Sequence, residues 1–463
     1  MKEIITNSEA LVLAAGKGVR MCSDKPKVLH EVCGQSLVGR TLNCLSEAGL
    51  KNISVVIGSG AELVRAEIES VNSNAKTVLQ TEQLGTGHAV QVALPELSKD
   101  YILILPGDVP LLKSEIIEAA FNAVAETAAD LLVLTFFPDD PAAFGRMVRD
   151  ADGNLQGIKE AKDCSEEELE IAEVNSGIYL LKRELLEKGL QGLSSDNAQG
   201  EIYLTDIVSY GAEKGYKLEG LAVEDPSQLA GANNRAELSE LELFRRLEIA
   251  EELMLSGVGV ESPAELFVDE GVRVGKDSFL GAGVHLKGQT TLGEGVVVQG
   301  YSSIENSQIA SGAKIKFSSV IEDSEVGANS NIGPFAHLRP GSMIGKDVKV
   351  GNFVETKKAI LKDGVKAGHL SYLGDATIEE EVNIGAGTIT CNYDGKNKHK
   401  TEIGKNSFIG SNSCLVAPVK VGEEAYIGAG SVITKEVPSK ALGIGRAKQS
   451  NKENWAGKDT KGE

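Results

Sequence analysis

The sequence has no apolar run long enough to cross a membrane, a single tryptophan, and no cysteine pair with CxxC spacing among its 463 residues. A membrane-spanning helix needs roughly 18 or more apolar residues in succession. The opening residues, MKEIITNSEA, lack the apolar core of a signal peptide. We therefore expect a soluble, cytoplasmic protein.

Positive charge is also scarce. Lys and Arg number 47 against 67 Asp and Glu, which leaves a net charge of −20. An acidic surface repels phosphate backbones and anionic lipids, so we expect no nucleic-acid partner and no membrane partner. Anionic small-molecule substrates stay possible, because the local field of a site can oppose the field of the whole protein.

The six cysteines show no metal-binding or disulfide pattern. None lies near a histidine in the way that zinc sites require, and free thiols in a reducing compartment are expected. The cysteines are Cys22, Cys33, Cys44, Cys164, Cys391 and Cys414.

Residues 1–235 alternate short apolar runs with stretches of helical period, such as residues 36–49 and 113–126. Such alternation predicts an α/β domain with a parallel sheet, Rossmann-like in its order, and ligands at the carboxyl ends of its strands. Residues 236–256 then read as one helical linker. The predicted strands are residues 10–16, 53–58, 101–108 and 130–136.

Residues 257–463 follow a different pattern, in which an apolar residue recurs at every sixth position. Neither a helix nor an alternating strand has this period. It predicts a left-handed parallel β-helix of hexapeptide repeats, in which three hexads complete one coil and the apolar residue points inward. An interruption at residues 385–402 predicts a functional loop. The in-phase residues are Val274, Leu280, Leu286, Leu292, Val298, Ile304, Val326, Ile332, Leu338, Ile344, Val350, Ile403, Ile409, Leu415, Val421, Ile427 and Ile433.

A glycine-rich turn, Leu13-Ala14-Ala15-Gly16-Lys17-Gly18, follows the first predicted strand. Its backbone N–H groups can approach phosphate oxygens, and Arg20 and Lys27 add positive charge. The turn is neither a dinucleotide fingerprint nor a Walker A loop. Asp108 ends a later strand at the same predicted edge of the sheet.

The complete string, LAAGKGVRM with Pro26-Lys27, resembles the signature of the sugar-nucleotide pyrophosphorylases. With the hexapeptide repeats behind it, the chain is similar nearly end to end to the bacterial bifunctional enzymes that join an N-acetylglucosamine-1-phosphate uridyltransferase to a glucosamine-1-phosphate acetyltransferase. The other motifs that carry the resemblance are Gln80, QLGTGHA at residues 83–89, Gly107-Asp108, FGR at 144–146, Glu160, NSGIY at 175–179 and GANNR at 231–235.

The resemblance implies roles for the first half of the chain. The domain would transfer UMP from UTP to N-acetylglucosamine-1-phosphate, making a nucleotide sugar for cell-wall and lipopolysaccharide precursors. Asp108 and Asn233 would bind Mg²⁺, with Arg20 and Lys27 as catalytic cations. The implied substrate-binding residues are Leu13, Ala14, Ala15, Gly16, Lys27, Gln80, Gly85, Thr86, Gly145, Glu160, Asn175 and Asn233.

Polar residues at positions of the repeat that a bare solenoid does not need predict chemistry in the second half. His suits general-base catalysis near neutral pH, and the resemblance gives this role to His369, which would accept a proton from the amine of glucosamine-1-phosphate. Arg339 and Lys357 would bind the sugar phosphate, and Tyr372 and Asn383 the sugar. The implied acetyl-CoA residues are Ala386, Asn392, Tyr393, Ser411, Ala429 and Arg446. The resemblance also implies a homotrimer.

Two alternatives stay open. One is a single-activity sugar-nucleotide pyrophosphorylase whose β-helix only oligomerises or regulates; the polar block around His369 and Tyr372 argues against it. The other is a non-enzymatic sensor of sugar nucleotides, which the presence of Arg20, Lys27 and Asp108 disfavours.

Overall fold

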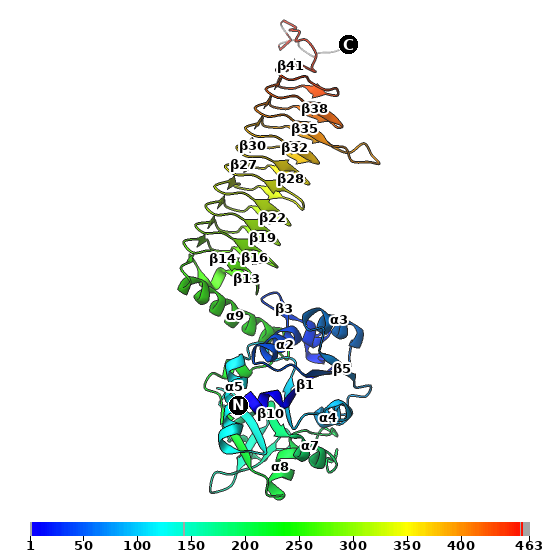
Figure 1. The fold of residues 1–463 in the computed structure, drawn as a ribbon, viewed down its shortest axis with the longest axis vertical. Coiled ribbons are helices and arrows are strands. Elements are labelled where there is room, and N and C mark those ends of the chain that lie inside the picture. Colours follow the sequence, from blue (N-terminus) through cyan, green and yellow to red (C-terminus); the bar gives the residue numbers. More distant parts are fainter. Residues whose placement is uncertain (1, 142–143, 454, 457–463) are drawn as a thin grey trace. The chain divides into compact units, whose positions relative to one another are not determined.

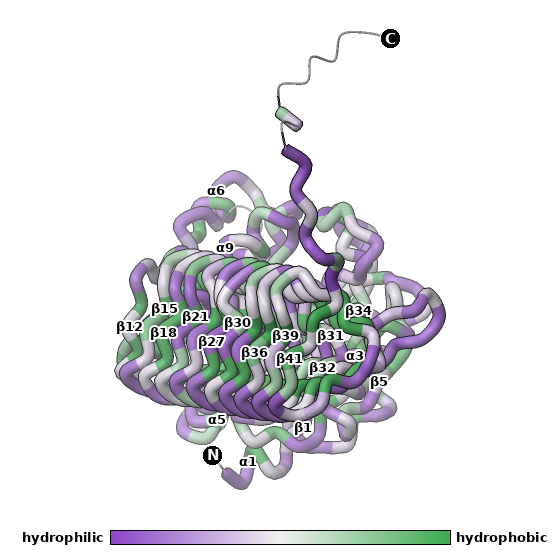
Figure 2. Tube along the Cα trace, turned by 90° about the horizontal axis from the view of Figure 1, so that it is seen from above, coloured by the Kyte–Doolittle hydropathy of each residue, from purple (hydrophilic) through white to green (hydrophobic). Residues whose placement is uncertain are grey.

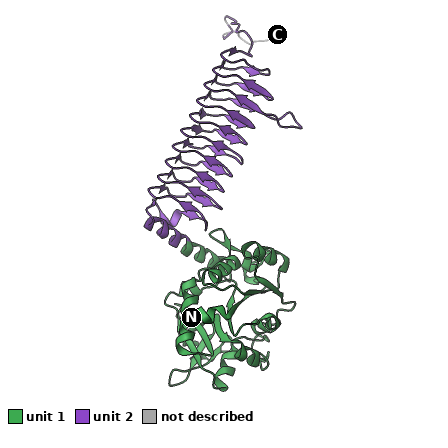
Figure 3. Cartoon of the chain, in the orientation of Figure 1, with its two compact units in different colours: residues 1–245 green, residues 246–463 purple. Residues whose placement is uncertain are grey.

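A computed structural model describes residues 2–141, 144–453 and 455–456. Its described residues form two compact units, one running to Arg245 and the other from Arg246 (Figure 3). The boundary between the units falls within helix α9 (Arg235–Leu255). This helix is continuous, as the sequence predicts. The predicted domain boundaries at 235 and 257 stay a prediction.

The first unit is built on one sheet with the strand order β11-β7-β10-β6-β1-β4-β5 (Figure 1). All four predicted strands are present as β1, β4, β6 and β7. The pairs β1–β4, β1–β6, β4–β5 and β7–β11 are parallel, as predicted, but β10 departs from the predicted parallel sheet and runs antiparallel to both β6 and β7. The hairpin β8–β9 breaks the strand–helix alternation after β7, so the chain re-enters the sheet from the opposite end. The strands are β1 (Ser8–Ala14), β4 (Ile53–Ile57), β5 (Lys76–Leu79), β6 (Tyr101–Pro106), β7 (Leu131–Phe136), β8 (Arg146–Arg149), β9 (Leu155–Lys159), β10 (Val174–Lys182) and β11 (Leu218–Ala222).

Helices cover both faces of this sheet. Alternate residues of β1 point to opposite sides, so Val12 packs in one core with residues of α2, α3 and α5, while Leu11 packs in the other with residues of α4, α7 and α8. The carboxyl ends of β1, β4 and β6 therefore share one open edge. The helices are α1 (Lys2–Thr6), α2 (Leu37–Glu47), α3 (Ala61–Val71), α4 (Thr86–Ala93), α5 (Ser114–Thr127), α6 (Glu166–Leu169), α7 (Arg183–Leu190) and α8 (Asp206–Glu213).

The second unit is the predicted parallel β-helix. Its three faces are each a stack of short parallel strands, one strand per coil. Figure 2 shows that hydrophobic and hydrophilic residues recur in stripes from coil to coil. The first face contains β12 (Gly259–Val260), β15 (Phe279–Leu280), β18 (Val297–Val298), β21 (Lys314–Ile315), β24 (Asn331–Ile332), β27 (Lys349–Asn352), β30 (Lys366–His369), β33 (Asn383–Ile384), β36 (Phe408–Ile409), β39 (Tyr426–Ile427) and β41 (Leu442–Gly443).

The other two faces are built in the same way. The second face contains β13 (Phe267–Val268), β16 (His285–Lys287), β19 (Ser303–Glu305), β22 (Val320–Glu322), β25 (His337–Leu338), β28 (Glu355–Lys357), β31 (Tyr372–Gly374), β34 (Ile389–Cys391), β37 (Cys414–Val416) and β40 (Val432–Ile433). The third face contains β14 (Arg273–Val274), β17 (Thr291–Leu292), β20 (Gln308–Ile309), β23 (Glu325–Val326), β26 (Met343–Ile344), β29 (Ile360–Leu361), β32 (Ala376–Ile378), β35 (Thr401–Ile403) and β38 (Val419–Val421).

The inward direction of the hexad residues is confirmed. All of the predicted in-phase residues are buried except Val274 in the first coil, which is half-buried. The phase of the in-phase residues slips between Ile304 and Val326. The structure gives the cause, because Phe279 aligns with Val297 but Val297 aligns with Lys314, so the coil shortens from eighteen to seventeen residues. The predicted interruption at 385–402 is too long. Strands β34 and β35 continue their ladders, and only residues 392–400 leave the coil.

Within the described part of the chain, no helix combines the length and apolarity needed to span a membrane. All six cysteines are free.

Candidate functional site

The glycine-rich turn lies at the open edge of the first sheet, where β1 ends. The Leu13 carbonyl accepts a hydrogen bond from the Gly107 N–H at 2.9 Å, so the carboxyl ends of β1 and β6 lie side by side. Gly16 faces open space, since a Cβ added there would have no heavy atom within 4 Å. Gly18 has φ +60°, and an added Cβ would lie 2.6 Å from Cβ of Lys27. Glycine at 18 therefore lets Lys27 pack directly against the turn.

Four predicted catalytic and metal-binding side chains meet beside this turn. The Asn233 Oδ1 accepts hydrogen bonds from Arg20 Nη2 at 2.9 Å and from Lys27 Nζ at 3.0 Å. The same Lys27 ammonium forms an ion pair with Asp108 Oδ2. The chain brings these groups together from positions more than 200 residues apart in sequence.

This arrangement fits a small hard cation. The carboxylate oxygen of Asp108 and the amide oxygen of Asn233 are ligands that Mg²⁺ accepts, and both converge on one cationic atom, Nζ of Lys27. The described residues contain no group of three or more His, Cys, Asp or Glu side chains placed to hold a metal ion. A metal held by Asp108 and Asn233 would therefore need further oxygen ligands from substrate or water.

Three predicted substrate-binding residues, Gln80, Gly85 and Thr86, lie around the end of β5 and the start of α4. Gln80 is buried, and its Nε2 donates to the Gly85 carbonyl at 3.3 Å and lies 3.0 Å from Nδ1 of His88. Gly85 has φ +114°, and a Cβ there would collide with the Ile202 carbonyl oxygen at 2.5 Å. The structure thus places Gln80 and Gly85 in direct contact and requires glycine at 85.

Thr86 is fixed by a different segment of the chain. Its Oγ1 accepts a hydrogen bond from the Leu204 N–H at 3.1 Å. The Gly87 N–H donates to the Ile202 carbonyl at 2.8 Å, so residues 202–204 close one side of the start of α4. Sequence reasoning missed this segment, which carries no recognisable motif.

Three further predicted substrate-binding residues, Gly145, Glu160 and Asn175, are neighbours. The Asn175 N–H donates to the Gly145 carbonyl at 2.9 Å, and a Cβ on Gly145 would lie 3.6 Å from Oε2 of Glu160. The Asn175 side chain donates from Nδ2 to the Tyr179 hydroxyl at 2.7 Å and accepts from the Gly177 N–H at 2.9 Å. Burial raises the pKa of Tyr179, which keeps its hydroxyl protonated.

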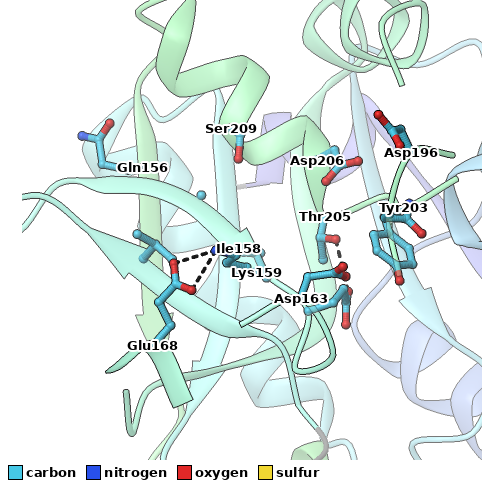
Figure 4. Close-up of a pocket in the computed structure, with 14 residues that line it drawn as sticks. Gln156, Ile158, Lys159, Asp163, Glu168, Asp196, Tyr203, Thr205, Asp206 and Ser209 are labelled. Atoms are coloured by element: carbon cyan, nitrogen blue, oxygen red, sulfur yellow. Dashed lines mark hydrogen bonds and ion pairs between the residues drawn. The ribbon is translucent and has the colours of Figure 1, made fainter. Parts of the chain in front are cut away.

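Glu160 also lines a cavity of about 410 Å³ between β9, α8 and the loops before and after them (Figure 4). Burial raises the pKa of the Glu160 carboxyl, the charges of Asp163 and Asp206 raise it further, and a 3.1 Å hydrogen bond from the Thr205 hydroxyl opposes them. The acids beside Glu160 were not predicted, since no motif marks them. The cavity is acidic and suits hydroxyl groups as hydrogen-bond donors.

In the second unit, predicted acetyl-transfer residues line one corner of the β-helix, between the first and second faces. His369 aligns with Asn352 of the preceding coil. When the register of β30, β33, β36 and β39 is continued to the corner, His369 also aligns with Ala386, Ser411 and Ala429 of the following coils. The predicted base and three predicted acetyl-CoA residues therefore form one column.

Two contacts extend this column. Nδ1 of His369 lies 3.0 Å from Oδ1 of Asn352. Arg446 Nη1 donates to the Ala429 carbonyl at 2.6 Å. Sequence reasoning did not single out Asn352, although the repeat places it one coil before His369.

The predicted phosphate-binding residues lie on the outer surface of the second face. Arg339 Nη1 pairs with Glu355 Oε1 at 2.7 Å, and Glu355 aligns with Tyr372 on the next strand. Lys357 aligns with Gly374, and the Tyr372 ring lies over that glycine, where an added Cβ would collide with its hydroxyl. Arg339, Lys357 and Tyr372 are therefore gathered, together with Glu355, which was not predicted.

Three predicted residues lie apart from this group. Asn383 is on the first face, aligned with Lys366. Asn392 and Tyr393 begin the loop that leaves the second face at its other edge, where Asn392 Nδ2 donates to Asp375 Oδ2 at 2.5 Å. The predicted acetyl-CoA residues thus lie at two opposite edges of the second face.

Comparison with known proteins agrees with this division of the chain. Residues 10–170 match the MobA-like NTP transferase domain family, residues 263–363 the GMPPB C-terminal domain, and residues 400–435 the hexapeptide repeat of succinyl-transferase. The chain is 45% identical to the bifunctional protein GlmU of Marinobacter nauticus, covering 96% of this chain and 97% of that one. It is 44% identical to the protein of the same name from Carboxydothermus hydrogenoformans, over 96% and 99%. Identity to that of Lactococcus lactis is 46%, over 96% and 97%.

Proposed function

The chain belongs to the family of the bifunctional protein GlmU, and from this we propose the substrates, cofactors and residue roles of its two transferase activities. The second unit transfers acetyl from acetyl-CoA to glucosamine-1-phosphate. The first unit then transfers UMP from UTP to the resulting N-acetylglucosamine-1-phosphate. Acetyl transfer releases coenzyme A, and uridylyl transfer yields UDP-N-acetylglucosamine and pyrophosphate.

The observation that carries the first activity is the meeting of Arg20, Lys27, Asp108 and Asn233 beside an open glycine-rich turn. An oxygen of the sugar phosphate attacks the α-phosphorus of UTP, and the bond to the β-phosphate oxygen breaks. The nucleophile is already an anion and needs no general base, so positioning and charge neutralisation supply the catalysis. Arg20 and Lys27 offset the repulsion between the two anions.

Asp108 and Asn233 would hold Mg²⁺, which supplies charge neutralisation for the triphosphate and for departing pyrophosphate. Gly16, Gln80, Gly85 and Thr86 would position the uridine. The remaining predicted residues, Gly145, Glu160 and Asn175, would hold the sugar. The donor groups of sugar hydroxyls match the carboxylate of Glu160 and the acidic cavity next to it.

For acetyl transfer, the amine nitrogen of glucosamine-1-phosphate attacks the thioester carbonyl carbon, and the carbon–sulfur bond breaks. His369 accepts the proton that the amine loses. A backbone N–H near Ala386 would stabilise the oxyanion. Arg339 and Lys357 would bind the sugar phosphate, with Tyr372 and Asn383 at the sugar.

A homotrimer would complete this site. Asn392 and Tyr393 lie across the second face from Ser411, Ala429 and Arg446, so a neighbouring β-helix packed along that face would bring both groups onto one acetyl-CoA.

An exposed aromatic stripe supports association between copies. Tyr301, Phe317, Phe335 and Phe353 follow one corner of the β-helix, with successive ring centroids 5.6, 6.1 and 5.5 Å apart. Each ring is more than 40% exposed. Contiguous exposed apolar surface of this kind marks interfaces, and this stripe ends at Leu370, next to His369.

The deciding experiment supplies glucosamine-1-phosphate, acetyl-CoA and UTP together, and then omits each in turn. UDP-N-acetylglucosamine should form only when all three are present. Replacing glucosamine-1-phosphate and acetyl-CoA by N-acetylglucosamine-1-phosphate should restore the product. A chain that uses N-acetylglucosamine-1-phosphate but never acetylates would support the single-activity alternative. Light scattering on active acetyltransferase tests the trimer, and an active monomer would exclude it.

A further inference from the structure

We propose that Asn352 is a positioning residue for acetyl transfer: its side-chain oxygen holds the His369 imidazole in the tautomer whose Nε2 is free to accept a proton. The inference rests on the proposed role of His369 as the general base.

The contact between the two side chains determines the tautomer. Nδ1 of His369 lies 3.0 Å from Oδ1 of Asn352. An amide oxygen can only accept a hydrogen bond, so Nδ1 must carry the hydrogen. In a neutral imidazole the lone pair then resides on Nε2. When Nε2 takes the proton of the attacking amine, the ring becomes cationic, and its hydrogen bond to Asn352 becomes charge-assisted and stronger.

The surroundings of His369 on the ladder are asymmetric. Asn352 lies level with it in the preceding coil, and Ala386 lies level with it in the following coil. One neighbour offers an amide and the other only a methyl group. The charged residues on β30 and β27 are Lys366 and Lys349, three residues earlier on each strand, which is about 10 Å along a strand. The Asn352 amide is thus the polar side chain that orients the ring.

The fold itself does not require the Asn352 side chain. Its backbone carbonyl accepts the ladder hydrogen bond from the Leu370 N–H at 3.1 Å, a bond that any residue at 352 could make. The backbone of His369 is held separately, since the Ser371 hydroxyl donates to its carbonyl at 2.9 Å. Removing the amide at 352 should therefore change the histidine and leave the coil intact.

Three variants test this in the full-length protein. Asn352→Leu keeps the approximate shape and removes the acceptor, and acetyl-transfer kcat should fall roughly 10- to 100-fold, the range expected for a hydrogen bond to a charged group. Asn352→Asp keeps an acceptor, so it should retain most activity at high pH. Its carboxylate favours the imidazolium form, so the acid limb of the kcat profile should move to higher pH. Asn331→Leu, on the same face at β24, is the matched control and should behave as wild type.

A double-mutant cycle separates positioning from a structural role. In a His369→Ala background, Asn352→Leu should cost no further activity, because there is no ring left to orient. Uridylyl transfer and the melting temperature, measured on the same preparations, report folding of all variants.

The outcomes distinguish the two proposals. If His369→Ala is fully active, the general-base role fails. If His369→Ala is impaired but Asn352→Leu matches wild type in rate and pH profile, or Asn352→Asp is as impaired as Asn352→Leu at every pH, then the positioning role of Asn352 is overturned. That role is also overturned if the losses of Asn352→Leu and His369→Ala multiply in the double variant.

Discussion

The two units bring distant residues together in different ways. In the first unit, side chains from positions 20, 27, 108 and 233 meet through two groups, the Asn233 amide oxygen and the Lys27 ammonium. In the second unit, the predicted residues follow one another from coil to coil, and residues at the same place in successive coils lie side by side. An α/β sheet directs many loops to one edge, whereas a solenoid places each coil only beside its neighbours. A site at the edge of the sheet in the first unit can therefore be complete within one chain. The predicted site of the second unit is spread over the second face of the β-helix and both edges of that face.

The convergent site should be the more sensitive of the two to a single change. Asp108→Ala removes a carboxylate that would hold the metal, which supplies several kcal/mol of charge stabilisation, so uridylyl transfer should fall about a thousandfold or more. Acetyl transfer by the same protein should be unchanged. Normal uridylyl transfer at saturating Mg²⁺ would show that the metal assignment is wrong.

His369 tests the aligned site in the same way. General-base help contributes about 10²- to 10⁴-fold, so His369→Ala should lower acetyl-transfer kcat by that factor and leave uridylyl transfer and the melting temperature near wild type. The deficit should shrink as pH rises, because solution then deprotonates the amine. A structural histidine would instead lower thermal stability and trimer assembly, with acetylation falling only in proportion to folded protein.

Mixed trimers would show whether the spread-out site is completed by a second copy. His369→Ala and Asn392→Ala disable different edges of the second face, so each homotrimer should be impaired. If each site is shared between two chains, trimers co-expressed with equal amounts of the two variants should regain about a quarter of wild-type acetyl transfer. At each interface the His369 edge and the Asn392 edge are each intact half of the time, so about one interface in four has both. The measurement is acetyl-transfer rate against subunit ratio. No recovery at any ratio would place both residues in one chain's site.

Removing the second unit should change the uridylyl-transfer rate of the first unit only slightly. A chain ending at Ser256 retains the sheet, both of its cores and all of helix α9. Uridylyl transfer to N-acetylglucosamine-1-phosphate should stay within about threefold of the full-length rate, as expected for a domain with its own core. A folded fragment without that activity would contradict independent domains.

The smallest effect concerns Glu160. Burial raises its pKa in the folded protein, so ionising it opposes folding. The protonated Glu160 carboxyl therefore favours the folded state. This contribution to the free energy of unfolding is full at pH values below the ordinary glutamate pKa and is lost as pH rises through the raised pKa of the folded protein. Glu160→Gln should therefore slightly raise the melting temperature at pH 8 and have little effect near pH 4, while KM for N-acetylglucosamine-1-phosphate increases. A melting temperature that falls at pH 8 would contradict the burial argument.

Much of the fold could be predicted because its signals are local. The hexapeptide period specifies which residue of each coil points inward, and every such residue after Val274 is buried. The strands β1, β4, β6 and β7 are mostly apolar runs bounded by turns. The reversed strand β10 could not be predicted in this way, because its direction depends on the β8–β9 hairpin that precedes it.

The site divides along the same line. The sequence by itself determined which residue types were available: the glycine-rich turn, the cations Arg20 and Lys27, and a histidine in a repeat that needs none. Only the tertiary structure decided that Asn233 receives both cations, that Glu160 faces other acids, and that Asn352 lies against His369. Sequence patterns report the backbone geometry of neighbouring residues, whereas a hydrogen bond between side chains depends on how elements far apart in the chain pack together.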